Sequence, residues 1–367
     1  MRDDRRNVDG SDLPGSFDVP VIVGEPMTAS AASGTSSAPV TAFAGSLSRL
    51  AFGGAPIGNL YRIVADDEAT KAVRRAWELG IRHFDTAPYY GYGLSESRIG
   101  EALHDVDRHS VTLSTKVGRI IESDAGRHDH ADGFVVDGRR ARFDYSRDGI
   151  LRSLEASLRR LRTDHIDILL LHDIGELTHG ANHPAVWRQA MDEALPTLAE
   201  LREQGVCRAI GLGVNEEAIC LQVMPRFPLD VIMLAGRYTL FEQQHGMAVM
   251  AQALARGVAI LAAGPYNSGL LGGSTRPGAF YNYESADAAT TARAQRYYDI
   301  CASTGVEVGA AAVQFPLAHP AVVSVVCGMR SVAEVESASR RLHATVPAAT
   351  WTALREAGLL ASDAPTP

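Results

Sequence analysis

Four polar side chains in the chain are of the types that transfer a proton and hold a carbonyl oxygen. Asp85 and Tyr90 lie in the run FDTAPYYG at 84–91, Lys116 ends the run STK, and His172 ends the run LLH. Each run closes an apolar segment with the character of a β-strand. If these segments are neighbouring strands of a parallel barrel, the four side chains meet at its carboxyl-terminal rim, where such barrels hold their catalytic groups.

These four side chains form a chemically consistent set. A free tyrosine has a pKa of about 10, and an adjacent ammonium such as that of Lys116 would favour the phenolate of Tyr90 and lower this pKa. Lys116 itself needs a counter-ion, because an unpaired buried charge is costly, and we expect Asp85 to supply it. His172 would orient the substrate oxygen, and a nicotinamide would carry the hydride.

The rest of the sequence supplies the elements that such a rim requires. Apolar strand-like segments alternate with helical segments, and glycines mark several helix ends. The predicted strands are 49–53, 81–85, 111–116, 166–172, 208–214, 231–235, 258–262 and 322–327. The predicted helices are 67–79, 95–103, 147–161, 187–204, 216–224, 246–256, 288–303 and 331–342. Eight of each in alternation predict an α/β fold, a closed (β/α)₈ TIM barrel over residues 46–367.

A tail and three long loops complete the predicted organisation. Residues 1–45 are rich in Ser, Ala, Gly and Pro without periodicity, and we expect a disordered tail. The segments 118–146, 173–185 and 264–284 follow the third, fourth and seventh predicted strands, so we expect long top-face loops. Their position on the catalytic rim indicates that they form walls of a substrate pocket.

The four polar residues resemble the tetrad of the aldo-keto reductase family: an Asp, a Tyr five positions later, then a Lys and a His on the next two strands. Further similar runs are FGGAPIGN at 52–59, SE at 95–96, LGVN at 212–215, AGRY at 235–238, NSGL at 267–270 and GMRS at 328–331. The resemblance covers about residues 47–360. It implies that Asp85, Tyr90, Lys116 and His172 are the catalytic residues.

The same resemblance implies a nicotinamide dinucleotide site. Asn215 would hold the nicotinamide carboxamide. The pyrophosphate would be covered by Ser268, Gly269 and Leu270, and the adenosine half would be received by Gly328, Met329 and Arg330. The last assignment also uses backbone N–H groups at a helix start as an anion site.

Several residues are similar to one branch of the family, the D-threo-aldose 1-dehydrogenases (L-fucose dehydrogenases) and pyridoxal 4-dehydrogenases. Ala235 and Ala263 replace a Gln and an aromatic that many members carry, and the runs AGRYTL at 235–240 and FDYSRDG at 143–149 also match this branch. The resemblance implies NAD(P)-dependent oxidation of an aldose at C1 to its lactone. Pyridoxal oxidation and general aldehyde reduction are alternatives. The expected substrate contacts are Asn59, Tyr89, Asp173 and Tyr266.

The segment MRSVAEVE at 329–336 indicates NAD rather than NADP. A 2′-phosphate needs fixed cations, and NADP-using relatives place Lys or Arg both just after strand eight and about one turn into the next helix. Here Arg330 is followed by Glu334 and Glu336, whose carboxylates would repel a 2′-phosphate.

Composition limits the other classes of function. The 367 residues carry a formal net charge of −8 and no basic cluster, which argues against nucleic acid or an anionic membrane as partner and favours a small carbonyl or sugar substrate. Four widely spaced cysteines indicate reduced thiols, and no segment has the character of a signal peptide or a membrane helix. We therefore expect a cytoplasmic protein, of undetermined oligomeric state.

Two other functions stay open at this stage. Lys116 could form a Schiff base in an aldolase-like enzyme, although Tyr90 has no evident place in that mechanism. The chain could also bind a cofactor without turnover, as a regulatory module. His83 is expected to be a core histidine, His128 and His130 are expected to be solvated, and no metal site is predicted.

Overall fold

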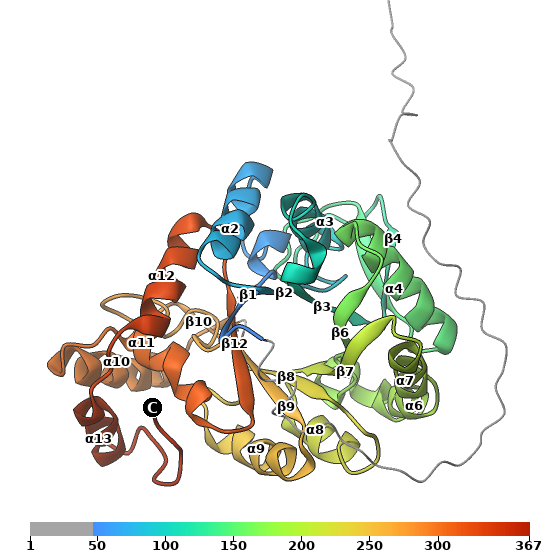
Figure 1. The fold of residues 1–367 in the computed structure, drawn as a ribbon. Coiled ribbons are helices and arrows are strands. Elements are labelled where there is room, and N and C mark those ends of the chain that lie inside the picture. Colours follow the sequence, from blue (N-terminus) through green and yellow to red (C-terminus); the bar gives the residue numbers. More distant parts are fainter. Residues whose placement is uncertain (1–46, 283) are drawn as a thin grey trace, which may run out of the picture. The chain divides into compact units, whose positions relative to one another are not determined.

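A closed barrel of eight parallel strands is the centre of the computed structural model, which describes residues 47–282 and 284–367 (Figure 1). The strands are β1 (Leu50–Gly53), β2 (His83–Asp85), β3 (Thr112–Val117), β6 (Ile166–His172), β7 (Cys207–Val214), β8 (Val231–Ala235), β9 (Ala259–Ala263) and β12 (Val322–Gly328). Strands that follow one another along the chain are neighbours in the barrel, which β1 and β12 close. The (β/α)₈ prediction is confirmed. The predicted tail, 1–45, lies outside the described residues.

Helices surround the barrel on its outside (Figure 1). They are α2 (Asp66–Glu78), α3 (Leu94–Ala102), α4 (Arg147–Leu161), α5 (Glu176–His179), α6 (His183–Gln189), α7 (Leu195–Glu203), α8 (Glu217–Val223), α9 (Gln244–Arg256), α10 (Ala288–Ser303), α11 (Val308–Gln314), α12 (Val332–His343) and α13 (Ala348–Glu356). The single helix expected at 187–204 is instead α6 and α7 joined by a π-helical turn, Ala190–Ala194. The helices α5, α11 and α13 were not predicted. They have at most nine residues each, which is too few for a clear helical periodicity.

Two of the loops on the rim contain antiparallel hairpins that the sequence analysis did not predict. The segment after β3 forms β4 (Arg119–Ser123) and β5 (Arg139–Phe143), and the segment after β9 contains β10 (Phe280–Tyr281) and β11 (Glu284–Ser285). Three of the five residues of β5 are arginines, so this strand lacks the apolar run by which the barrel strands were recognised. The third rim segment, after β6, contains the short helix α5.

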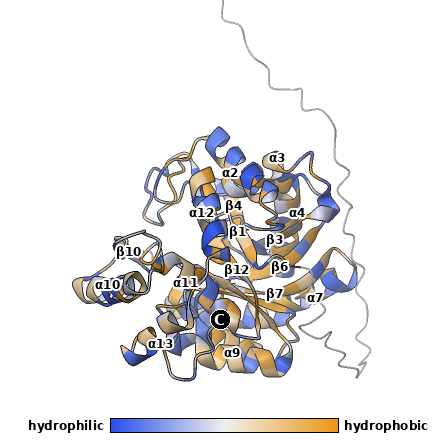
Figure 2. Ribbon diagram, turned by 60° about the vertical axis from the view of Figure 1, so that its left-hand side comes forward, coloured by the Kyte–Doolittle hydropathy of each residue, from blue (hydrophilic) through white to orange (hydrophobic). Residues whose placement is uncertain are grey.

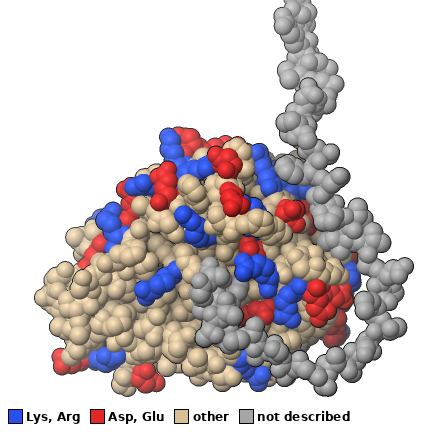
Figure 3. Space-filling view, in the orientation of Figure 1, with Lys and Arg blue, Asp and Glu red and all other residues tan. Residues whose placement is uncertain are grey.

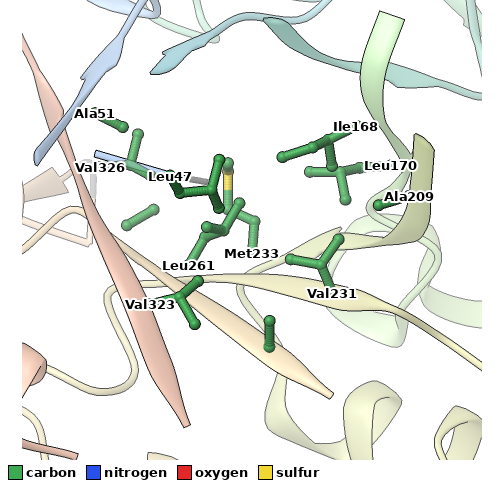
Figure 4. Packing of buried hydrophobic residues seen from close by; sticks show 12 residues of the cluster. Leu47, Ala51, Ile168, Leu170, Ala209, Val231, Met233, Leu261, Val323 and Val326 are labelled. Atoms are coloured by element: carbon green, nitrogen blue, oxygen red, sulfur yellow. The ribbon is translucent and has the colours of Figure 1, made fainter. Parts of the chain in front are cut away.

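The barrel interior is divided into an apolar and a polar part. An apolar cluster fills the side lined by β6 to β9, β12 and β1 (Figure 4). Its buried members are Leu47, Ala51, Ile168, Leu170, Ala209, Val231, Met233, Ala259, Leu261, Ala263, Val323 and Val326. β2 and β3, by contrast, carry several buried polar side chains: His83, Asp85, Thr112, Ser114, Thr115 and Lys116. The barrel strands are hydrophobic in Figure 2, whereas parts of the surrounding helices are hydrophilic.

The outer surface carries charges of both signs. On the face shown in Figure 3, basic and acidic side chains are interspersed without an extended patch of one sign. Among the described residues, no helix taken singly has the length and apolarity to cross a membrane. Only α10 and the segment Val308–Ala318, bent by 102° against each other, meet both criteria as a pair.

Candidate active site

Three adjacent strands bring the tetrad together. β2, β3 and β6 are consecutive in the barrel, and Asp85, Lys116 and His172 lie at or near their carboxyl ends. Asp85 pairs in register with Ser114, two residues before Lys116. Tyr90 follows in a turn whose backbone lies against the loop after β1. There a side chain on Gly91 would come within 2.3 Å of the Gly58 carbonyl oxygen, so this close approach requires glycine.

A buried ion pair joins Lys116 to Asp85. The Lys116 ammonium donates to both carboxylate oxygens, at 3.0 and 2.9 Å, and to the carbonyl oxygen of Thr86 at 2.9 Å. The two side chains are only 2% and 3% exposed. Burial by itself would lower the pKa of Lys116, but the charges of Asp85 and Tyr90 outweigh it and hold that pKa above its ordinary value. Lys116 is therefore a fixed cation, which makes its amine a poor Schiff-base nucleophile.

The Tyr90 ring lies directly beside this cation. The Lys116 nitrogen is 4.5 Å from the ring centroid, and the His172 ring centroid is 6.1 Å away. Burial raises the pKa of Tyr90, Lys116 lowers it, and the net result is above the ordinary value. Lys116 lowers the pKa of Tyr90, as expected. The expected net lowering of this pKa is wrong, because burial destabilises the phenolate more than the neighbouring ammonium stabilises it.

His172 is held as a neutral imidazole. Burial and the nearby charges of Arg119 and Lys116 lower its pKa well below the ordinary value. The Tyr145 hydroxyl donates to the His172 carbonyl oxygen at 2.8 Å and fixes the end of β6. A neutral ring carries one N–H group, so His172 can donate a hydrogen bond to a substrate oxygen without bringing a charge to it.

Two further polar residues extend the tetrad into the barrel. The Ser114 hydroxyl donates to Asp85 at 2.8 Å and lies 2.9 Å from His83 Nε2. Because the serine proton goes to Asp85, its oxygen accepts from the Nε2–H of His83. His83 is fully buried, as expected of a core histidine, but its contact with Ser114 was not foreseen. Its position two residues before Asp85 on one strand was the available signal, because such residues share a face.

Gly213 on β7 makes room for the lysine. A Cβ atom at this position would lie 3.1 Å from both Cδ and Cε of Lys116. Gly213 also pairs in register with His172. Since a side chain here would push the Lys116 stem aside, the glycine helps to set the position of the ammonium.

The hairpin β4–β5 covers the tetrad. Phe134, in the loop between its two strands, stacks on Tyr90 with centroids 6.1 Å apart. Phe134 also forms an isolated bridge with Leu60. The Asp132 carboxylate accepts a hydrogen bond from Tyr89 at 3.2 Å and one from Tyr92, which ties the hairpin to the catalytic turn.

The four candidate substrate contacts fall into two groups. Tyr89 and Asp173 lie beside His172: the ring centroid of Tyr89 is 6.4 Å from that of His172, and an Asp173 oxygen is 3.3 Å from His172 Nε2. Asn59 is instead bound to Arg98, Val64 and Val135, and it holds loops together. Tyr266 lies near Arg341 of α12, 5.3 Å from its guanidinium, and is not brought to the tetrad.

The candidate cofactor residues lie on the other arc of the rim. Asn215 follows β7, the segment 268–270 follows β9 and the segment 328–330 ends β12, and these strands lie on one side of the barrel. Ala235 and Ala263 pair at the ends of β8 and β9, and Gly236 and Gly264 follow.

Two glycines of this arc have open space beside their backbone. No heavy atom lies within 4 Å of a Cβ built on Gly236 or Gly269, and Gly269 has a φ of 91° on an exposed turn. Ser331 caps the N-terminus of α12, whose N–H groups lie at the rim. The residues present therefore fit a nicotinamide dinucleotide, with Asn215 beside the tetrad strand β6 and α12 at the far end.

Other possible sites are not supported by the described part of the chain. Within it, no group of three or more His, Cys, Asp or Glu is arranged to hold a metal ion. His128 and His130 both lie near Asp137, at 3.6 and 3.0 Å. All four cysteines are buried and free.

Comparison with known proteins identifies the class of this one. Residues 49–358 match the sequence profile of the Aldo/keto reductase family, and the chain belongs to this family. It is therefore an oxidoreductase that acts on CH–OH groups with a nicotinamide cofactor.

Individual relatives cover most of the chain. It is 38% identical over 322 residues to pyridoxal 4-dehydrogenase of Microbacterium luteolum, and the match covers 85% of this chain and 94% of the relative. It is 37% identical over 341 residues to D-threo-aldose 1-dehydrogenase of a Pseudomonas species, 91% of this chain and 100% of the relative. Among solved structures, glycerol dehydrogenase of Gluconobacter oxydans is similar with a TM-score of 0.67 and 25% identity, over 88% of this chain and 94% of that one.

Replacement of Tyr90 by Phe should remove turnover while leaving dinucleotide binding intact, because it deletes only the hydroxyl that exchanges the proton. We expect kcat to fall about 10²–10⁴-fold, with the cofactor Kd from fluorescence titration unchanged. Tyr238→Phe is the matched control, since the Tyr238 hydroxyl is buried without a hydrogen-bond partner among the described residues. A Tyr90→Phe enzyme that kept most of its kcat would exclude Tyr90 as the proton-transfer group.

Replacement of Ser114 by Ala should move the acid limb of the kcat/KM profile to higher pH. Burial already raises the pKa of Asp85, and the Ser114 hydroxyl opposes this rise. Without that donor Asp85 accepts a proton at a higher pH, because the hydrogen bond stabilises only the charged carboxylate. Ser303→Ala, which removes an exposed hydroxyl bonded to its own helix, is the control. A loss that is equal at every pH would contradict this role.

Proposed function

We propose that the protein oxidises an aldose at C1 to its lactone with NAD as acceptor. Two relatives of nearly equal identity are named as dehydrogenases of an aldose and of pyridoxal. The observation that favours the aldose is the carboxylate of Asp173 beside His172, since the Asp173 side chain is 19% exposed. A charged acceptor at this position suits a hydroxylated substrate better than a simple aldehyde, because hydroxyl groups replace the water that the carboxylate loses.

The tetrad residues divide the proton chemistry between them. His172 donates its N–H to the reacting C1 oxygen and positions it at Tyr90. In oxidation Tyr90, as phenolate, removes the hydroxyl proton, and Lys116 stabilises that phenolate by its charge. Asp85 keeps Lys116 charged and in place. A bound nicotinamide supplies the acceptor for the hydride from C1. Since burial raises the pKa of Tyr90, oxidation should become faster as the pH rises above neutrality.

The preference for NAD rests on the start of α12. Glu334 accepts a hydrogen bond from the Arg330 backbone N–H at 2.9 Å, and its other oxygen lies 3.2 Å from the Arg330 guanidinium. Its carboxylate therefore lies at the start of α12 and pairs with the one arginine of this segment. A 2′-phosphate would meet the Glu334 charge, whereas the hydroxyl of NAD can donate to it.

The experiment that tests the substrate assignment is a panel of purified enzyme with NAD against L-fucose, D-arabinose, L-galactose and pyridoxal. We expect NADH formation with at least one aldose and recovery of the corresponding lactone. Oxidation of pyridoxal alone would replace the aldose by the alternative substrate. If none of these is oxidised but simple aldehydes are reduced well, the protein is a general aldehyde reductase, and the assignment of the tetrad is unaffected.

The cofactor assignment predicts that kcat/KM is at least about tenfold higher with NAD than with NADP, which is about 1.4 kcal/mol. Replacement of Glu334 by Gln should narrow this ratio several-fold by removing the repelling charge. Glu336→Gln is the control on the same helix, because that carboxylate pairs with Arg75, at 2.9 Å. A tenfold preference of the unaltered enzyme for NADP would overturn the assignment.

A further inference from the structure

We propose that Asp173, held in place by Arg119, binds the hydroxyl group on the carbon next to the one that is oxidised. The inference rests on the proposed function in the choice of an aldose. It goes further by assigning one side chain to one substrate hydroxyl, and by giving Arg119 a role that the sequence analysis did not foresee.

The Asp173 backbone is fixed at the rim. Its N–H donates to the Gly213 carbonyl oxygen at 3.1 Å, and its own carbonyl oxygen accepts from the Tyr145 hydroxyl at 3.0 Å. A ring nitrogen of His179 is 2.8 Å from the same carbonyl oxygen. The residue has a φ of 46°, in the left-handed region that non-glycine residues rarely adopt. These contacts hold a conformation that places the carboxylate beside His172.

Arg119 fixes the side chain of Asp173 in turn. Its Nη2 donates to Asp173 Oδ2 at 2.5 Å. Its guanidinium carbon lies 3.8 Å from the Tyr89 ring centroid and 4.7 Å from that of Phe143. The arginine side chain is 6% exposed, whereas that of Asp173 is 19% exposed. Asp173 is therefore the more accessible member of the pair, and the Arg119 guanidinium is packed against two aromatic rings.

The distance from His172 selects which substrate oxygen Asp173 can reach. Asp173 Oδ2 is 3.3 Å from His172 Nε2, the ring nitrogen that we assign to the reacting oxygen in the proposed mechanism. An oxygen that contacts both the carboxylate and the reacting centre must lie on the same carbon or on the next one. An ionised carboxylate only accepts hydrogen bonds, so it cannot bind the ring oxygen of a cyclic hemiacetal. The hydroxyl on C2 is the donor that remains.

The charges around the site favour a neutral hydroxyl group there. Burial raises the pKa of Asp173, the charges of Arg119 and Lys116 oppose this rise, and Glu216 adds a second negative charge nearby. The charge of Asp173 also acts on the Tyr90 phenol. Arg119 is already engaged by Asp173. A carboxylate or phosphate on the neighbouring carbon would be repelled, whereas a neutral hydroxyl group gains a charge-assisted hydrogen bond.

The test compares two aldehydes that differ in this hydroxyl group, D-glyceraldehyde and 3-hydroxypropanal, in reduction with NADH. We expect the unaltered enzyme to have a kcat/KM about tenfold or more higher for glyceraldehyde. Asp173→Asn, which keeps the shape but removes the charge, should lower kcat/KM for glyceraldehyde about tenfold and for 3-hydroxypropanal less than threefold. Asp164→Asn, at the other end of β6 with a side chain 78% exposed, should change neither.

Equal losses with the two aldehydes would overturn the inference, because a carboxylate that only positions His172 or the hairpin serves both substrates alike. So would equal activity of the unaltered enzyme on the two aldehydes, a result that does not depend on the folding of any variant. In oxidation with NAD, kcat/KM should be lower for the 2-deoxy form of an aldose than for the aldose itself, by a similar factor. If no aldose is oxidised, the proposed function fails, while the pair of aldehydes still decides the role of Asp173.

Discussion

The site depends on one buried ion pair, Lys116 with Asp85. Removing both charges from water is costly, and their attraction offsets this cost only if the remaining hydrogen-bonding groups are satisfied. The barrel supplies them: the Thr86 carbonyl oxygen accepts from the ammonium, and the Ser114 hydroxyl donates to the carboxylate. Gly213 leaves the space that the lysine stem crosses. The pair then sets the electrostatic environment of Tyr90, whose pKa reflects both burial and the neighbouring cation.

The strand order separates the tetrad and the candidate cofactor residues into two arcs of the rim. β2, β3 and β6 carry the tetrad, and β7 to β9 with β12 carry the candidate cofactor residues. The apolar cluster in the interior lies mainly under the second arc, and the polar chain from His83 to Lys116 lies under the first. Asn215, which would hold the nicotinamide carboxamide, follows β7, the neighbour of the strand that bears His172.

Specificity comes from the segments after the strands. The hairpin β4–β5 brings Phe134 onto Tyr90 and places Arg119 behind Asp173. These contacts are made by side chains that are distant in sequence, and none of them is needed for the barrel to close. One barrel can therefore keep its proton chemistry while a change in the hairpin alters the substrate.

The sequence by itself determined the barrel and the meeting of Asp85, Tyr90, Lys116 and His172 at its rim, because strand periodicity and rim position depend on local patterns. It also located Asp173 near the chemistry. Only the tertiary structure decided that Asn59 and Tyr266 make internal contacts and that Arg119, Ser114 and His83 support the site. It also decided that burial outweighs Lys116 in setting the pKa of Tyr90. Burial and pairing are properties of the folded surroundings, and residue type and spacing do not specify how much water a side chain loses or which distant group replaces it.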